Sequence, residues 1–229
     1  MVFRAGRILM LASSLLAPAA TLATLESQTA ARPESLKVAA DYRQAVIASG
    51  EYDRAIAFFE RLAGQPGAGP HVFLNLAFAY IDKIPAVGAF RRISLGNHAT
   101  AALTRSIERE PSDLAYLVRG MVNLRFEKGF FHRTPQGVAD LERALQLAAP
   151  HLDRPYVARI YLSLGDGHWR LKNHDTARDT WRAGLARFPN DPRLAMRLTS
   201  ADAAVTDAIT HDLDAGVRVD TRLRDLTAD

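Results

Sequence analysis

Apolar residues recur at steps of three and four along most of the chain, with charged residues between them. The pattern is clearest in AIAFFERL, LTRSIERE and VADLERALQL. Such spacing places the apolar side chains on one face of an α-helix, and no segment shows the alternation of a half-buried strand. We therefore expect an all-α protein of about eight or nine helices.

The segment from residue 165 to residue 189 has the residue spacing of two closely packed antiparallel helices. Gly165 and Ala177 are the small residues at the crossing, Trp181 lies beside them, and Pro189 ends the unit. This segment resembles one tetratricopeptide repeat, a helix, a short turn and a second helix that stack on neighbouring units. The resemblance implies a solenoid that binds other molecules and does not catalyse reactions.

Three further copies of the pattern extend the resemblance to roughly residues 36–192. Their second helices carry a small residue where the last copy has Ala177, namely Ala55, Ala99 and Gly137. The intervals between these four positions are 44, 38 and 40 residues, whereas the family repeat has about 34 residues. The resemblance therefore implies a right-handed α-solenoid of about four helix pairs, with extra residues inserted in the units.

The extra residues fall between the two helices of the second and third pairs, in residues 81–98 and 125–137. Stacked units keep their orientation, so these inserts should emerge side by side on one edge of the solenoid. Both inserts are rich in aromatic and cationic side chains, which dominate the binding energy of many protein interfaces. The candidate partner-binding residues are Phe90, Arg91, Arg92, Phe130, Phe131, His132 and Arg133.

A packing role is open for the same residues. The phenylalanines would then fold their own loops onto the helices, and the arginines would cap carbonyl groups at helix ends. The concave face of the solenoid is a second candidate surface, because this family commonly holds extended peptides there. Helical spacing places Asn75, Arg119 and Asn123 on that face, and a carboxamide can both donate to and accept from a peptide backbone.

The first 23 residues differ from the rest of the chain. Two arginines stand among the first seven residues, and an apolar stretch with several small residues runs from Ile8 to about Ala23. This is the pattern of a secretory signal peptide, with cleavage after Ala19, Ala20 or, as we prefer, Ala23. An uncleaved membrane anchor and a first helix of the fold are the alternatives. The stretch is short for a membrane span, and Pro18 disfavours a packed helix.

Charge and composition change this picture little. The chain has 29 basic and 25 acidic side chains, and loss of the leader would remove Arg4 and Arg7 and leave a net charge of about +2. A nearly balanced charge is typical of a solvated surface, so we expect no nucleic acid partner. The absence of cysteine excludes disulfides and a lipid-modified cysteine. The leader and the alanine-rich, arginine-rich composition predict the periplasm of a Gram-negative bacterium, or secretion.

The predicted organisation has four parts: a leader at 1–23, a linker at 24–35, the repeat domain at 36–213 and a tail at 214–229. One helix from Pro192 to Leu213 should end the repeat domain and cap the array. The tail is short and charged, and we expect it to be extended or mobile, or docked through Val219 and Leu223.

The sequence shows no catalytic or metal-binding pattern. The seven histidines lack close ligand spacing, and the acids in residues 212–220 lack the third ligand and the closing glutamate of a calcium loop. There is no GxSxG motif and no thiol nucleophile. We therefore expect no cofactor, no metal and no enzymatic activity, and we predict an adaptor that binds a partner protein or peptide.

Two other functions fit the same fold. A solute-binding accessory component of a transport system would enclose a small ligand in a deep apolar pocket with a few convergent polar groups. A self-assembling scaffold would form homo-oligomers through the exposed ends of the solenoid. Contact with a membrane is expected only through an uncleaved leader.

Overall fold

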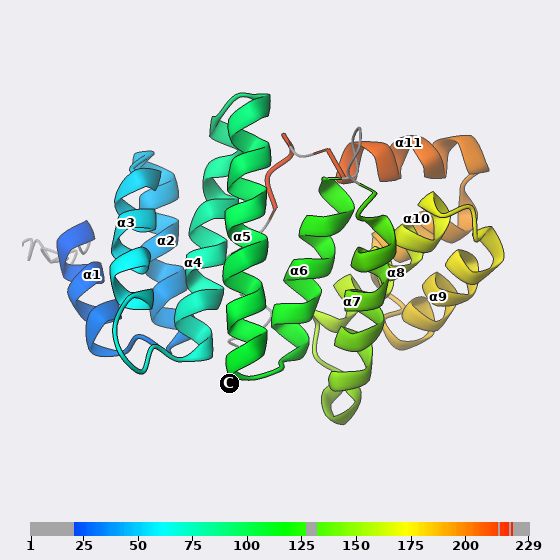
Figure 1. Cartoon of the computed structure of the whole chain (residues 1–229). Helices are drawn as coiled ribbons and strands as arrows, with labels where there is room; N and C mark the ends of the chain where they lie inside the picture. The colour runs from blue at the N-terminus through cyan, green and yellow to red at the C-terminus, as the bar shows by residue number, and fades with distance from the viewer. Residues whose placement is uncertain (1–20, 127–131, 215, 220, 222–229) are drawn as a thin grey trace, which may run out of the picture.

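The computed structural model describes residues 21–126, 132–214, 216–219 and 221. These residues form eleven α-helices and two short 3-10 helices, and the helices stand side by side in chain order (Figure 1). No strand occurs in the described residues. The predicted all-α fold is confirmed.

Four helix pairs make up the body of the molecule. Their bounds are Leu36–Ser49 (α2) with Tyr52–Ala63 (α3), Pro70–Lys83 (α4) with Ala89–Arg109 (α5), Asp113–Arg125 (α6) with Thr134–Leu147 (α7), and Val157–Arg170 (α8) with His174–Arg187 (α9). Each helix packs mainly against its neighbours in the sequence. The expected solenoid of helix pairs is therefore confirmed.

The two helices of a pair cross where the small residues were predicted. A Cβ atom at Gly165 on α8 would clash with the indole nitrogen of Trp181 on α9, and Trp181 is fully buried. A Cβ atom at Gly120 on α6 would lie 2.9 Å from the carbonyl oxygen of Gly137 on α7. Glycine at these positions lets the helices approach more closely than any larger residue would.

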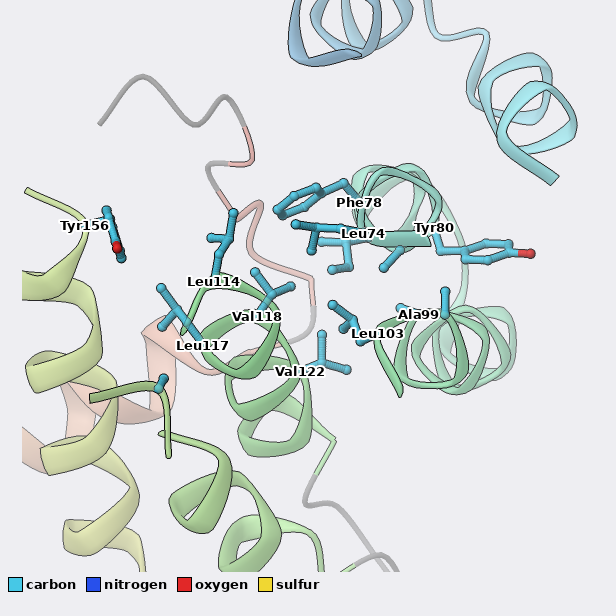
Figure 2. Close-up of a cluster of buried hydrophobic side chains, with 14 of the residues drawn as sticks. Leu74, Phe78, Tyr80, Ala99, Leu103, Leu114, Leu117, Val118, Val122 and Tyr156 are labelled. Carbon is cyan, nitrogen blue, oxygen red and sulfur yellow. The ribbon is translucent and has the colours of Figure 1, made fainter. Parts of the chain in front are cut away.

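Buried apolar side chains join the pairs into one continuous core. Figure 2 shows the part between α4, α5 and α6, where Leu74 and Phe78 meet Leu103, Val118 and Val122. Each helix contributes side chains to the helices on both of its sides, so no pair buries its apolar surface alone.

Helix α1, Leu22–Ala31, occupies most of the segment that was predicted to be a linker. The Thr21 side chain accepts a hydrogen bond from the backbone N–H of Thr24 and caps the helix. Glu26 accepts a hydrogen bond from the Tyr42 hydroxyl (2.6 Å) and forms an ion pair with Arg54 (2.8 Å). The linker prediction is wrong here because partners on α2 and α3 hold this polar segment.

Two helices follow the last pair, where one was predicted. Pro192–Thr199 (α10) packs on α9, and Leu194 is fully buried. Ser200 and Ala201 have extended backbone angles and separate α10 from Asp202–Asp212 (α11). The aspartate in the first turn of α11 favours a new helix start at this point. Helix α10 thus covers the end of the array. Helix α11 lies across the top of the last helices in Figure 1, where Thr206 accepts a hydrogen bond from Trp169 on α8 (3.1 Å).

The first insert is helical and not a loop. It contains the 3-10 helix η1, Ile84–Ala86, and the first turns of α5, which has 21 residues against 14 in α4. Helix α5 consequently rises beyond α6 at the top of Figure 1. Gly88 has the extended backbone of an N-cap, and the residues after it are compatible with a helix.

Candidate interaction groove

The first helices of the pairs line a groove, and the chain after α11 lies in it. We call the described residues 216–219 and 221 the C-terminal strap. It passes between α4 and α6, as the faint red chain in Figure 2 shows. Val217 and Val219 line the same apolar cavity as Phe78, Leu117 and Val118. The volume left in that cavity is only about 50 Å³, so the strap fills most of the apolar groove.

The most buried polar contacts of the strap are with α2 and α4. Arg43 donates through Nη2 to the carbonyl oxygen of Thr221 (3.0 Å) and through Nη1 to Asp82 (3.2 Å). The Thr221 hydroxyl donates to the other carboxylate oxygen of Asp82. Burial raises the pKa of Asp82, although Arg43 acts in the opposite direction. Because Arg43 and Asp82 are 0% and 3% exposed, loss of either partner would leave a buried charge uncompensated.

A second arginine holds the strap at the end of α6. Arg125 donates through Nη1 to the carbonyl oxygens of Asp214 (3.0 Å) and Val217 (3.4 Å). At the other side of the groove, Arg218 donates to the carbonyl oxygen of Asp82 (3.1 Å) and to the Tyr52 hydroxyl (3.0 Å). Arg43 and Arg125 thus bind main-chain carbonyls, which every extended peptide offers whatever its side chains.

Beyond the strap the groove continues between α6, α8 and α10 as a cavity of about 300 Å³. Its basic lining residues are Arg125, Arg159, Arg193 and Arg218. Its two acids, Asp166 and Asp212, both form ion pairs with the fully buried Arg197, at 2.9 and 2.8 Å. Burial raises the pKa of Asp166, against the effect of Arg197. The cavity wall therefore presents more positive than negative charge.

One part of this helix array matches a known repeat family. Residues 158–201, which cover α9, α10 and nearly all of α8, match the tetratricopeptide repeat (TPR) model. This part of the chain is thus similar to one tetratricopeptide repeat. A thermophilic TPR protein of Thermus thermophilus, TTC0263, has a similar fold in its crystal structure. The TM-score is 0.58 at 17% sequence identity, over 81% of this chain and 88% of that chain. No curated protein matches the sequence.

The likeness to the TPR fold allows a general statement about such domains. TPR domains are generally protein interaction modules, and the TPR fold is typically non-catalytic. Within the described ranges, no three histidine, aspartate or glutamate side chains are grouped so that they could hold a metal ion. Among the helices of those ranges, none is long and apolar enough to cross a membrane.

The first insert of the TPR array exposes part of what the sequence predicted. The Phe90 side chain is 92% exposed, and Arg91 is exposed beside it. Arg92 instead donates through Nε to the carbonyl oxygen of Val87 (2.8 Å), and a Cβ atom at Gly216 of the strap would lie 2.9 Å from its Nη1. Arg92 therefore has the carbonyl-capping role that the sequence left open, and it borders the strap.

The second insert meets the first, as predicted. Arg133 donates through Nη2 to the Asn97 side chain (2.8 Å), and the Phe126 ring lies directly against Gly96. His132 is exposed at the same edge. The predicted residues Phe130 and Phe131 lie outside the described residues.

The three groove residues predicted from helical spacing lie elsewhere. Asn75 is fully buried and donates to the carbonyl oxygen of His71 (2.9 Å). Arg119 and Asn123 both donate to Asp140 on α7, at 2.9 and 3.3 Å. Their predicted outward orientation is wrong, because Asn75 is buried and bonds to its own helix, whereas Arg119 and Asn123 bind the second helix of their pair.

The residues that do line the groove were not singled out from the sequence. Arg43, Asp82 and Arg125 stand on first helices among many other charged residues, and no motif marks them. The strap has a weak local signature, since Val217, Val219 and Thr221 are β-branched residues at alternate positions, as in an extended segment. The predicted docking of Val219 is confirmed, whereas Leu223 lies outside the described residues.

Proposed function

We propose that the protein is a non-catalytic adaptor of the cell envelope that binds an extended segment of a partner protein along the groove. The observation that carries this proposal is the 300 Å³ cavity between α6, α8 and α10, which continues the groove beyond the strap. Its size and position allow a peptide to lie along the first helices, as the general role of TPR domains suggests.

The charge of this cavity favours an acidic partner. Arg159 on α8 and Arg193 on α10 both line it, and Arg193 also forms an ion pair with Asp191 (2.9 Å). Arginine pairs with carboxylates through two parallel hydrogen bonds, and such pairs gain strength where the groove excludes water. The acids of the wall are engaged by Arg197, so they compete little for a partner's charge. A partner segment with aspartate or glutamate residues fits this wall best.

The groove supports an adaptor better than a solute-binding component. A small-molecule site generally has about 300 Å³ or more of mainly apolar space. The apolar cavity beside the strap offers about 50 Å³, and the larger cavity is lined by six charged residues as well as by apolar ones. A peptide that spans both regions uses the apolar wall and the arginines together.

Affinity capture from a native envelope extract tests this function. The Arg159→Glu variant reverses one charge of the cavity wall, and Arg182→Glu reverses an exposed charge on α9 as the matched control. We expect the parent and Arg182→Glu to retain the same dominant protein, and Arg159→Glu to retain about tenfold less of it. The parent and both variants could instead capture equal amounts of the partner, while a Phe90→Ala, Arg91→Ala variant loses it. That result would place the binding site at the insert edge and contradict binding in the groove.

We further propose that residues 1–20 are removed on export to the periplasm. The Thr21 side chain caps α1, so cleavage after Ala20 leaves the helix start intact, whereas cleavage after Ala23 removes the cap. The intact mass of the protein recovered from a periplasmic fraction tests both points. Recovery of the uncleaved chain in the cytoplasm alone would refute the export proposal.

A further inference from the structure

After a turn closed by the hydrogen bond from the Val217 N–H to the Asp214 carbonyl oxygen (3.0 Å), the strap binds the groove as an extended peptide ligand would. Two β-branched side chains, Val217 and Val219, face the apolar wall of α4 and α6. Arginines at both ends of the strap, Arg43 and Arg125, take its main-chain carbonyls. Apolar side chains at alternate positions together with main-chain hydrogen bonds are the two components of extended-peptide recognition.

The strap leaves part of the hydrogen-bonding capacity of the groove unused. The Nε atoms of Arg43 and Arg125 are buried and have no hydrogen-bond partner among the described residues. Burial lowers the pKa of both guanidinium groups, which nearby carboxylates oppose. A buried donor without an acceptor destabilises the state that contains it. A segment that supplies acceptors to these two atoms would therefore bind the groove better than the strap does.

The position of the strap makes it a competitor of such a segment. Val217, Arg218 and Val219 line the 300 Å³ cavity as well as the apolar one, so the strap overlaps the site of the proposed function. A tethered segment acts at an effective concentration near the millimolar range. A free segment with the same contacts would be excluded, and only one with additional contacts would displace the strap.

We propose that the strap is an internal ligand of the groove, and that the partner is an extended, acidic segment that displaces it. This inference rests on the proposed function. The partner carries apolar β-branched residues at two alternate positions against Phe78 and Val118. A hydroxyl two residues later reaches Asp82, as the Thr221 hydroxyl does. Its carboxylates lie among the arginines of the larger cavity.

A binding measurement on the full chain tests the internal ligand. The Val217→Lys, Val219→Lys variant places two positive charges against the apolar wall and beside Arg125 and Arg159, and should release the strap. The matched control, Ala203→Lys, Ala204→Lys, adds the same charges at exposed positions of α11. The probe is a fluorescein-labelled peptide of residues 214–221, and its anisotropy reports binding. Circular dichroism shows whether each variant keeps its helices.

We expect the released variant to bind the probe at least tenfold more tightly than the parent and the control. Adding Val118→Glu to the released variant should abolish that binding. If the folded parent and the folded released variant bind the probe equally, or if neither binds it, the proposal that the strap is an internal ligand is overturned. Concentration-dependent dimers of the parent that the released variant does not form would also overturn it, because the strap would then exchange between two copies.

Envelope capture with the same variants separates the two proposals. More partner on the released variant than on the parent supports both. A partner that the parent and the released variant retain equally, but Arg159→Glu loses, leaves the adaptor function standing and overturns the internal ligand. Probe binding to the released variant, with no partner captured by any variant, supports the internal ligand and contradicts the adaptor function.

Discussion

At the scale of single residues, the spacing of α8 and α9 depends on the missing side chain of Gly165. The Trp181 indole lies where a Cβ atom of residue 165 would stand, and its Nε1 donates to the carbonyl oxygen of Leu162 (3.3 Å). Both the ring position and the hydrogen bond require the two backbones to approach closely. The TPR-like pattern of small and aromatic residues therefore indicates a short distance between the two helix backbones.

Replacing Gly165 with valine should destabilise the protein by about 3 kcal/mol, because a buried indole cannot move away without disturbing the core. Ala183→Val places the same side chain at an exposed position of α9 and should cost only about 0.5 kcal/mol through helix propensity. Urea denaturation of both variants gives the two differences. Similar values for the two would show that the crossing tolerates a larger residue.

Residues of the groove were harder to predict than residues of the crossings. A residue at a helix crossing must be small, and small residues therefore recur at regular intervals in the sequence. No such pattern marks Arg43, since a lone arginine in an amphipathic helix is usually exposed. It is buried here because Asp82 and Thr221, 39 and 178 residues away, surround it. Asn75 shows the converse, since helical spacing does not reveal which face a neighbouring pair will cover.

At the scale of elements, α1 is held to the array by Leu22 and Leu25, which pack against the core, and by a few polar contacts. Glu26 joins it to Tyr42 on α2 and Arg54 on α3. The hydrogen bond from Arg54 lowers the pKa of Glu26 from its ordinary 4.5, with a further contribution from Tyr42. The docking of α1 therefore depends on the ionised form of one carboxyl group.

Helix α1 should undock in acid. A lowered folded-state pKa means that the contribution is present above the ordinary pKa and is lost as the pH falls through the lowered one. Amide hydrogen exchange of residues 22–31, corrected for intrinsic rates, should accelerate below about pH 4. Glu26→Gln should show fast exchange already at pH 7, with little pH dependence. Glu108→Gln, an exposed change on α5, should behave like the parent, and equal exchange in Glu26→Gln would contradict this role.

The helices also show how much of the secondary structure the sequence pattern predicts. Four helix pairs follow from periodicity and the spacing of small residues, and the structure has them. The first insert was expected to be a loop because it breaks the family spacing. Residues 89–98 instead continue as helix, since nothing in their sequence stops one once Gly88 has started it. The break between α10 and α11 was missed because Ser200 and Ala201 are not strong helix breakers.

At the scale of the whole molecule, the strap changes how the array is connected. A repeat protein usually has contacts only between adjacent units, so distant units unfold almost independently. Here Thr221 bonds Arg43 and Asp82, and Arg218 bonds Tyr52. Arg218 and Thr221 of the strap are thereby attached to the first two pairs.

Release of the strap should loosen the first two pairs more than the last. In the Val217→Lys, Val219→Lys variant we expect about tenfold faster amide exchange in α2 and α4, because Arg43 and Asp82 lose their strap contacts. Exchange in α9 should stay as in the parent, since α9 packs on α8 and α10. Uniform acceleration along the whole chain would indicate a general loss of stability, and no change in α2 would refute the connection.

The attachment of the strap to Arg43 and Asp82 has a consequence for any complex. A partner that displaces the strap also removes the tether of α2, so binding energy and the integrity of the first repeat are linked. If the partner's own segment reaches Arg43, it restores the tether and protects that repeat from proteases. If the segment stops short, α2 and α3 become the protease-sensitive part of the complex, and the cleavage pattern then measures how far along the groove the partner extends.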